Sequence, residues 1–347
     1  MGSNKQYRKE RRLSRLFQVL AIGLLLCVIG VTALGCSGQL LGEESTTAKP
    51  LETTAAETET TGFTVGGVVD PLAFMEGAEH TLYAEFLNTG KSDSILIRMD
   101  DQVILVDTGD DDDYNAIKAK LDGYGINTID YLIITHYDND HIGAADDVLK
   151  NYTVKMVYAP DYVRNSGDYR DMIQASVQVA ARTTFQKITE DVELDLGYGK
   201  VWINPTALEG YDSNQILGND TANATIEENN YSLIAVVRFG EAVMVLPGDA
   251  EDDRVAEWVP LFEEKMGGTL KGPKTFLKIP HHGSYDQGTA KILQSVAPWH
   301  CVVCSDSASV ESNLEGGIKQ NSGAAVYYTY NGSVLFATDG TTCAVQQ

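Results

Sequence analysis

The sequence predicts an α/β protein whose core is two sheets with helices on the outside. Short runs rich in β-branched and aromatic residues recur from about residue 79 to the C-terminus. Several are apolar over their whole length, as strands covered on both faces are. Helical stretches separate these runs, and the pattern repeats in two similar halves. Other layered α/β arrangements fit the same order of elements, so the motifs at the strand ends have to decide between them.

The elements follow one another along the chain without an internal repeat of roughly 20 to 50 residues, which excludes solenoids and propellers. The expected strands are Thr81–Leu87, Ser94–Met99, Gln102–Asp107, Ile129–His136, Val154–Pro160, Val201–Pro205, Ser232–Phe239, Glu241–Asp249, Lys274–His282, His300–Ser305 and Val334–Asp339. The expected helices are Tyr114–Leu121, Ala144–Lys150, Tyr169–Arg182, Arg254–Met266 and Thr289–Val296.

An export signal precedes these elements. Residues Lys5–Arg15 form a basic cluster, and Leu16–Gly35 are almost wholly apolar. Small residues stand directly before Cys36 in VTALGC, which resembles the lipobox at which bacterial lipoproteins are cleaved and acylated. A stretch of about 20 apolar residues can also span a bilayer uncleaved. Residues 1–36 are therefore expected to be a lipoprotein-like signal peptide or a membrane anchor, and either one holds the domain at the outer face of the cell membrane.

Residues 37–76 are rich in Thr, Glu and Ala and are expected to form a disordered tether before one folded domain, residues 77–347. The whole chain has a formal charge of −23, but six basic residues and one acidic residue lie in the first 36. The remainder holds 20 basic against 48 acidic groups, or −28. The negative electrostatic potential of such a chain repels polyanions, so a nucleic-acid substrate needs a metal ion or a basic groove to attract it locally. Acidity that serves solubility alone is the alternative.

Three of the five cysteines follow the signal segment, Cys301, Cys304 and Cys343, which excludes a dense disulfide framework. Cys301 and Cys304 stand three apart on an expected strand, where they point to opposite faces. This favours core packing over a redox dithiol or a metal chelate. A bridge to Cys343 is the alternative.

The first chemical motif follows the expected strand that ends at His136. The sequence HYDNDH places His136, Asp138, Asp140 and His141 within six residues. Imidazole and carboxylate are ligands that zinc and manganese accept, and a turn after a strand can make them converge. The alternative is a solvated acidic loop with incidental histidines, but the spacing His-x-Asp-x-Asp-His is restrictive.

Two later strand ends supply further ligands. LKIPHHGS brings His281 and His282 after an apolar strand, with Gly283 permitting a sharp exit, and VMVLPGDA presents Asp249. Four of the six histidines of the chain stand in HYDNDH and LKIPHHGS. We prefer His282 over His281 as the ligand, because the residue beside Gly283 lies closer to the turn.

Seven motifs in order resemble the metallo-β-lactamase superfamily, and within it the hydrolase domain of ComEC-type DNA-uptake competence proteins and their stand-alone relatives. They are FLNTGKSDSILI, like the family's FxDVGQGDSxLI, and ILVDTG, THYDNDHIGA, NNYSL, VLPGDA, LKIPHHGS and YNGSVLFATDG, which together cover roughly residues 79–340. The resemblance implies a four-layer αββα sandwich with the metal site at one edge. It also implies that Asp107, Asn230 and Ser232 support the ligands.

The sequence departs from the family at the metal site. Asp138 stands where the β-lactamase-like pattern has a second histidine, and no histidine occurs between His141 and Asp249. One imidazole of a dinuclear site is therefore missing, and Asn229 or Asn230 is a weaker substitute. The expected cofactor is one or two divalent ions, zinc, or manganese because of the carboxylates. A late Tyr-Gly-His-Pro stretch of the family is also absent.

The expected activity is hydrolysis by a metal-bound hydroxide, and the resemblance to the ComEC domain implies a phosphodiester of nucleic acid, a nucleotide or a cell-wall polymer. Asp140 is expected to orient the hydroxide. Lys278 is expected to meet a phosphoryl oxygen, unless it is a solvated charge at a strand end. Ser284 and Tyr137 are further positioning groups. A cell-wall esterase of the choline-phosphate type, or a non-catalytic surface protein with a degenerate metal site, are the alternatives.

Overall fold

The computed structural model describes residues 64–65, 68–208, 216–217, 227–267 and 274–347. The signal segment 1–36 with Cys36, and most of the tether, lie outside the described residues. At the end of the expected tether the structure describes the strands β1 (Thr64–Val65) and β2 (Val68–Val69) and a 3-10 turn, η1 (Ala73–Met75). Among the described residues, no helix combines the length and the apolar character needed to cross a membrane.

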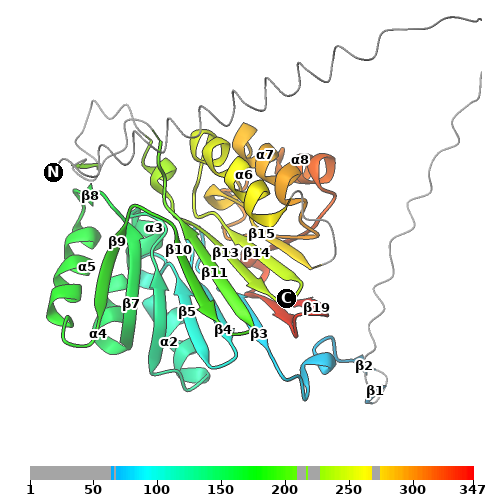
Figure 1. The fold of residues 1–347 in the computed structure, drawn as a ribbon, viewed down its shortest axis with the longest axis horizontal. Helices are drawn as coiled ribbons and strands as arrows, with labels where there is room; N and C mark the ends of the chain where they lie inside the picture. The colour runs from blue at the N-terminus through cyan, green and yellow to red at the C-terminus, as the bar shows by residue number, and fades with distance from the viewer. Residues whose placement is uncertain (1–63, 66–67, 209–215, 218–226, 268–273) are drawn as a thin grey trace, which may run out of the picture. The chain divides into compact units, whose positions relative to one another are not determined.

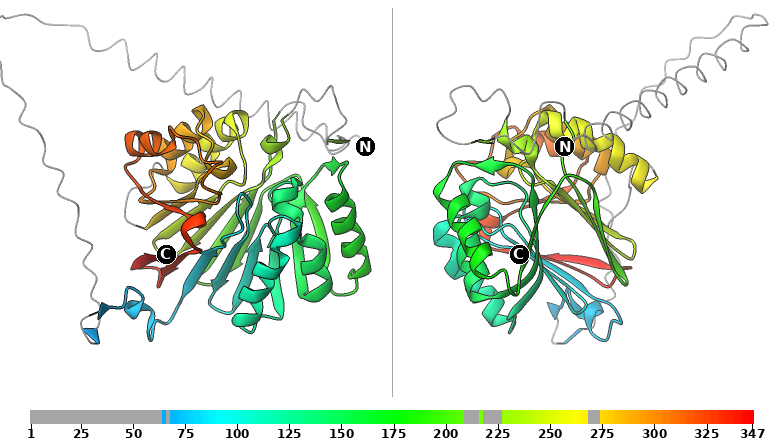
Figure 2. Two further views of the ribbon diagram at one scale, coloured as in Figure 1. Left: turned by 180° about the vertical axis from the view of Figure 1, so that it is seen from behind. Right: turned by 60° about the vertical axis from the view of Figure 1, so that its left-hand side comes forward.

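Two mixed sheets lie face to face (Figures 1 and 2). The first sheet has, in spatial order, β19 (Cys343–Gln346), β18 (Val334–Thr338), β3 (Leu82–Phe86), β4 (Ile95–Met99), β5 (Gln102–Val106), β6 (Thr128–Ile133), β7 (Thr153–Pro160) and β9 (Thr184–Ile188). The second has β10 (Val192–Leu196), β11 (Gly199–Asn204), β13 (Ile234–Phe239), β14 (Ala242–Leu246), β15 (Thr275–Lys278), β16 (His300–Val303) and β17 (Ala325–Tyr328).

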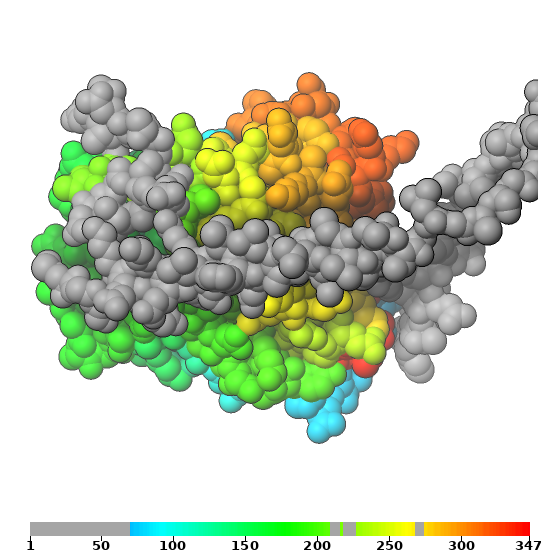
Figure 3. All heavy atoms as spheres, turned by 45° about the horizontal axis from the view of Figure 1, so that its top comes forward, coloured from blue at the N-terminus to red at the C-terminus, as the bar shows by residue number. Residues whose placement is uncertain are grey.

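Helices cover the outer face of each sheet. Those on the first sheet are α2 (Tyr114–Gly123), α4 (Ala145–Asn151) and α5 (Gly167–Gln178). Those on the second sheet are α6 (Asp252–Met266), α7 (Gln287–Val296) and α8 (Leu314–Asn321). In the space-filling view of Figure 3, the yellow-to-orange surface of these last three helices lies at the upper right. The order of layers is therefore helix, sheet, sheet, helix, as the sequence predicts.

The buried side chains explain why so many strands read as uninterrupted apolar runs. They form one cluster between the sheets and one beneath each helical layer. Along β13, Ile234 and Val236 point to the helices, whereas Ala235 and Val237 point to the facing sheet. Because successive side chains of a strand alternate between faces, a strand in this position buries all of them.

The cysteine prediction is confirmed for Cys301 and Cys304. Cys301 packs in the cluster under the helices, and Cys304, just after β16, packs in the cluster between the sheets. No disulfide links Cys301, Cys304 or Cys343, the three cysteines of the described residues. The two thiols face opposite sides of one sheet, so neither a bridge nor a chelate between them is possible.

Four of the five expected helices lie within two residues of the observed bounds, one differs more, and several elements were not expected. The helix predicted over Tyr169–Arg182 begins at Gly167 and ends at Gln178. The Ser166 hydroxyl accepts a hydrogen bond from the Tyr169 amide (3.2 Å), which fixes its start. Arg182 follows the helix in a turn, in which its amide donates to the carbonyl of Val179 (2.9 Å), and its guanidinium donates to the carbonyl of Leu149 (2.9 Å) at the end of α4. Sequence analysis missed β9, β10, β17, β19, α8 and the short α3 (Asn139–Ile142). Most of these are edge strands or single short helices, whose apolar signal is weak.

The topology brings four motif-bearing strand ends to one edge of the sandwich. β5 and β6 are parallel neighbours in the first sheet, and β14 and β15 are parallel neighbours in the second. The turns after them carry Asp107, His136, Asp249 and His282. The two edges touch at Gly248, where an added Cβ would lie 2.7 Å from the Thr135 Cβ, so a side chain there would force the turns apart.

Candidate metal centre

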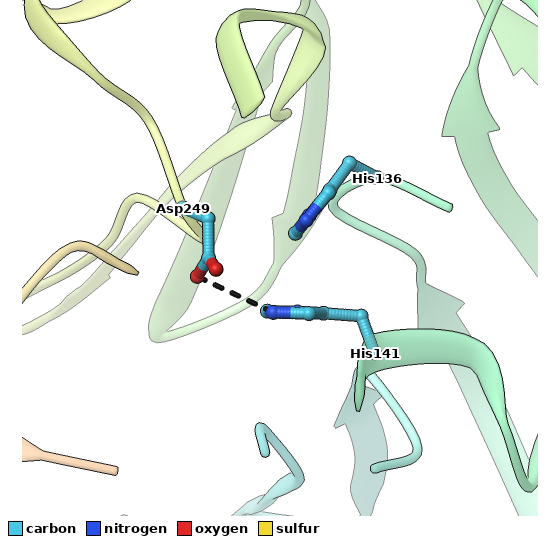
Figure 4. A group of neighbouring side chains, drawn as sticks. All are labelled: His136, His141 and Asp249. Carbon is cyan, nitrogen blue, oxygen red and sulfur yellow. Dashed lines mark ion pairs between the residues drawn. The ribbon is translucent and has the colours of Figure 1, made fainter. Parts of the chain in front are cut away.

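The cluster is built from the ends of β6, β14 and β15 together with α3. β6 ends at Ile133, and His136 lies on the following turn, while α3 carries Asp140 and His141. Figure 4 shows His136 and His141 approaching Asp249 from the opposite sheet, with the ion pair between His141 and Asp249 drawn as a dashed line. Ligand atoms of His136, His141 and Asp249 lie within 4.8 Å of one another, as do those of Asp140, His141 and His282.

Four residues bring their ligand atoms closest together. The Nε2 atom of His141 is 3.3 Å from Oδ1 of Asp249 and 3.3 Å from Nε2 of His282. The Nε2 atom of His282 is 3.1 Å from Oδ2 of Asp249 and 3.3 Å from Oδ2 of Asp140. Two imidazoles and two carboxylates that point their lone pairs at one another form a donor set for a divalent cation. We refer to Asp140, His141, Asp249 and His282 as the four-ligand group.

The far side of each imidazole is held by a hydrogen bond. Nδ1 of His141 lies 2.7 Å from Oδ2 of Asp107, and Nδ1 of His282 donates to the carbonyl of Cys304 at 2.9 Å. These partners hold a proton on Nδ1 and direct Nε2 into the cluster, so that Nε2 can donate its electron pair once a cation replaces the proton there. Asp107 is fixed in turn by the amide and hydroxyl of Thr135, at 2.8 and 2.7 Å.

His136 also indicates a bound cation, because one of its ring nitrogens is buried without a hydrogen-bond partner in the part of the chain that the structure describes. Its ring is fully buried, and its Nε2 atom has no hydrogen-bond partner among the described residues. Buried polar atoms are nearly always paired, so an orphan imidazole nitrogen beside two carboxylates calls for a partner that the protein chain does not supply. His136 therefore belongs to the metal centre, although it faces fewer ligand atoms than the four-ligand group does.

The electrostatics of the cluster favour a bound positive charge. Burial opposes protonation of His282, but Asp249 and Asp140 outweigh it and raise the pKa of His282 to about 9. Burial likewise opposes protonation of His141, yet Asp249 and Asp107 raise its pKa well above the ordinary range. His136, by contrast, has its pKa lowered by burial and by the charge of His141. In the metal-free chain two imidazolium protons therefore stand where a cation can replace them.

Lys278 lies behind this cluster rather than in solvent. Its side chain is fully buried, and Nζ is 2.5 Å from Oδ2 of Asp93, 3.2 Å from Oδ1 of Asp249 and 2.9 Å from the carbonyl of Gly248. It is therefore not a solvated charge at a strand end, because the carboxylates hold it inward. Its expected contact with a phosphoryl oxygen stays a prediction.

Arg164 approaches the cluster from outside the motifs. It ion-pairs with Oδ1 of Asp138 and, at 2.8 Å, with Oε2 of Glu228. Asp138 thus has a cationic partner, while its other oxygen is 3.9 Å from Nε2 of His136. A second basic residue, Lys91, lies 3.7 Å from Oδ2 of Asp140 and is 45% exposed.

The geometry separates the two neighbouring histidines. His281 is about one-third exposed and pairs through Nδ1 with Glu251 at 3.2 Å. His282 points into the four-ligand group, as preferred from its place beside Gly283, which adopts φ 98°. Both histidines have positive φ, 46° and 51°, which is a strained backbone for residues other than glycine.

The remaining expected site residues support the turns. The Asn229 side chain contacts Glu251 (2.9 Å), and the Asn230 side chain accepts from the amide of Arg254 (3.0 Å), so neither amide takes the place of the missing imidazole. The Ser232 hydroxyl accepts from the amide of Asp249 at 3.3 Å. Two more expected positioning groups lie away from the four ligands, because Ser284 bonds to Glu311 (3.0 Å) and the buried Tyr137 bonds to the carbonyl of Pro160 (2.7 Å).

Sequence reasoning missed three charged groups at the site, Asp93, Arg164 and Lys91. Asp93 and Lys91 stand inside the quoted motif FLNTGKSDSILI, whose match to the family was the available signal. Arg164 lies in no motif, and its approach to Asp138 depends on the tertiary fold alone.

The αββα sandwich and its strand-end cluster of imidazoles and carboxylates define a metal-dependent hydrolase. The family model of the metallo-beta-lactamase superfamily matches residues 87–298, more than half of the sequence, and the chain belongs to this superfamily.

Curated relatives confirm the resemblance to ComEC-type proteins. The chain is 24% identical over 237 residues to ComE operon protein 3 of Bacillus subtilis, covering 63% of this chain and 28% of the relative. It is 26% identical over 239 residues to Recombination protein 2 of Haemophilus influenzae, covering 67% of this chain and 25% of the relative. The chain thus matches about a quarter of the length of each.

Two solved structures are also similar to this chain. The metallo-beta-lactamase fold protein YhfI of Bacillus subtilis is 15% identical with a TM-score of 0.46, covering 72% of this chain and 96% of that one. The metallo hydrolase Igni18 of Ignicoccus hospitalis is 12% identical with a TM-score of 0.43, covering 77% and 99%.

Proposed function

We propose that this chain is an extracytoplasmic phosphodiesterase that acts at the outer face of the membrane. The observation that carries the proposal is the four-ligand group, whose nitrogen and oxygen atoms converge at 3.1 to 3.3 Å. Two cationic side chains, Lys91 and Arg164, flank this group through Asp140 and Asp138. A metal centre flanked by cations suits an anionic ester better than a neutral one.

The residues of the chain have separable tasks in this proposal. A divalent ion held by the four-ligand group, zinc or manganese, would supply Lewis acidity and lower the pKa of a bound water. Burial opposes ionisation of Asp140, but the hydrogen bond from His282 and the charge of His141 lower its pKa, so it stays a carboxylate at neutral pH. At 24% side-chain exposure, it can accept a hydrogen bond from the attacking water and orient it. Lys91 and Arg164 would draw the anionic group toward the site.

The substrate class follows from charge. A chain with a formal charge of −28 after residue 36 repels a long polyanion, so we propose a short or local phosphodiester: a nucleotide-like ester or a phosphodiester of a surface polymer. The similarity to ComEC-type relatives supports a nucleic-acid or nucleotide ester, and the location proposed below supports the surface polymer. A panel that contains oligonucleotides, cyclic dinucleotides and choline-phosphate esters separates them.

The activity test uses the full chain purified in detergent. After reconstitution with Zn²⁺ or Mn²⁺ it should hydrolyse bis(p-nitrophenyl) phosphate, and Asp140→Ala should lose roughly 100-fold or more. His80→Ala, which replaces a partly exposed histidine paired with Asp100 outside the cluster, is the matched control and should keep full activity. Absence of bound metal after reconstitution would sink the proposal. Metal binding with no turnover on any member of the panel would favour a surface binding protein.

The location is tested separately. We propose that Cys36 carries a lipid or, failing cleavage, that residues 16–35 remain as an N-terminal membrane anchor. Metabolic labelling with a palmitate analogue should mark the wild-type chain and not Cys36→Ala. Label on neither, with the chain still in the membrane fraction, supports the anchor. A chain wholly in the cytosolic fraction contradicts both.

A further inference from the structure

A short two-stranded sheet holds the backbone of Arg164 in place. It ends β8 (Val163–Arg164), which pairs in parallel with β12 (Ile216–Leu217), and the amide of Asn165 donates to the carbonyl of Leu217 at 2.7 Å. Leu217 is buried in the hydrophobic cluster of the first helical layer. The side chain of Arg164 is only 11% exposed. The backbone of Arg164 is therefore anchored beside the metal centre and not carried on an exposed turn.

The partners of Arg164 are fixed as well. Glu228, which pairs with Arg164, accepts a hydrogen bond from the hydroxyl of Tyr162 at 2.6 Å. That hydroxyl accepts in turn from the amide of Tyr137 at 2.8 Å. Tyr137 lies between His136 and Asp138 in the chain, so this network joins the guanidinium to the backbone of the first ligand motif. A charged pair with this support keeps one geometry.

The two halves of the metal centre are unequal. The four-ligand group has two imidazoles and two carboxylates that face one another. On the other side, His136 shares Asp249 with the four-ligand group, Asp138 is paired with Arg164, and the chain has no histidine between His141 and Asp249. A second cation there would meet one imidazole, a shared carboxylate and an arginine that repels it.

We propose that Arg164 replaces the second metal ion: the chain holds one divalent cation, on the four-ligand group, and the guanidinium supplies the second positive charge next to the substrate. The Nε atom of Arg164 is buried and has no acceptor among the described residues, so its N–H is an unpaired donor at the site. The count of metal ions does not depend on the substrate. The contact with an anionic oxygen rests on the proposed function.

Counting the bound metal ions tests the first part of the proposal, that the chain holds one divalent cation. Metal-free full-length chain in detergent is titrated with Mn²⁺, followed by calorimetry and by electron paramagnetic resonance. Wild type should bind one tight ion with the spectrum of an isolated Mn²⁺. Arg164→Ala and Arg164→Gln free Asp138 and should bind a second ion with an exchange-coupled spectrum. Arg170→Ala, an exposed arginine six residues along the chain, should behave as wild type.

Two outcomes overturn the proposal of a single metal ion: two coupled ions in wild type, or one ion in both Arg164 variants. Arg164→Gln keeps most of the side-chain volume, so it decides the matter if Arg164→Ala does not fold, as judged by circular dichroism.

Binding of inorganic phosphate tests the second part of the proposal, the contact between Arg164 and an anionic oxygen, and does not require turnover. With one equivalent of Mn²⁺ present, Arg164→Gln should bind phosphate about 10- to 100-fold more weakly than wild type, because it loses a charged hydrogen-bond donor. Arg170→Ala should bind it unchanged. Equal affinity in wild type and Arg164→Gln overturns the contact. Since neither measurement requires hydrolysis, each remains decisive if the chain turns over no phosphodiester.

Discussion

Replacing Lys278 by methionine tests whether the buried charges behind the metal centre hold the two sheets together. The ammonium lies 2.5 Å from Asp93 and 3.2 Å from Asp249, and both carboxylates are almost fully buried. Burial opposes protonation of Lys278, but the two carboxylates outweigh it and raise the pKa of Lys278 above its ordinary value, so the side chain is charged at pH 7. Methionine keeps most of the stem volume, so lost packing adds little.

The magnitude follows from which carboxylate is left alone. Asp249 keeps the charges of His141 and His282, which with burial dominate its pKa, whereas Asp93 loses its nearest cation. Removing one partner of a buried ion pair costs about 3–5 kcal/mol, so Lys278→Met should lower the free energy of unfolding by about that amount at pH 7. The double variant Lys278→Met/Asp93→Asn should recover most of it, because no buried charge remains without a partner.

Urea unfolding of the metal-free full-length chain measures this loss. Lys274→Met is the control: it removes a lysine just before the same strand whose partner, Glu241, is mostly exposed, and such surface pairs contribute about 0–1 kcal/mol. A loss for Lys278→Met no larger than that of the control would refute the reasoning. So would a double variant as unstable as Lys278→Met itself, because the cost would then come from packing and not from charge.

Three further predictions follow from single groups. Because the pKa of His282 is raised to about 9 in the metal-free chain, a metal ion must displace its proton at lower pH. The proton on His141, whose pKa is also raised, has to be displaced as well. Competition with a fluorescent chelator should therefore show an affinity that rises about 100-fold per pH unit below about pH 9 and less steeply above it; a flat profile from pH 6.5 to 8.5 contradicts it. Asp107→Asn, which weakens the hold on His141, should reduce metal affinity about 10- to 100-fold, whereas Asp100→Asn, another aspartate with positive φ beside a histidine, should not. Burial raises the pKa of the Cys343 thiol from 9.0 to about 11. Iodoacetamide at pH 8, followed by mass spectrometry, should therefore label this thiol about 100-fold more slowly than a model thiol. Labelling at the rate of the model thiol would show that this burial is absent.

The fold could be predicted from the sequence because two kinds of local signal agree. Strands such as β13 are apolar throughout, which indicates burial on both faces, and the ligand motifs follow strand ends, where parallel neighbours bring them together. The edge strand β10 was missed because its side chains are alternately exposed and half-buried, so its apolar signal is weak.

The sequence by itself determined the chemistry of the centre: six histidines, four of them in two motifs, with carboxylates at fixed spacing, specify a divalent metal wherever the turns converge. Only the tertiary structure decided which groups meet. The choice of His282 over His281 depends on backbone angles at the turn, and the inward position of Lys278 depends on Asp93, 185 positions earlier in the chain. Arg164 reaches Asp138 because β8 pairs with β12. Spacing along the chain fixes which side chains are available, whereas long-range packing fixes the direction in which each one points.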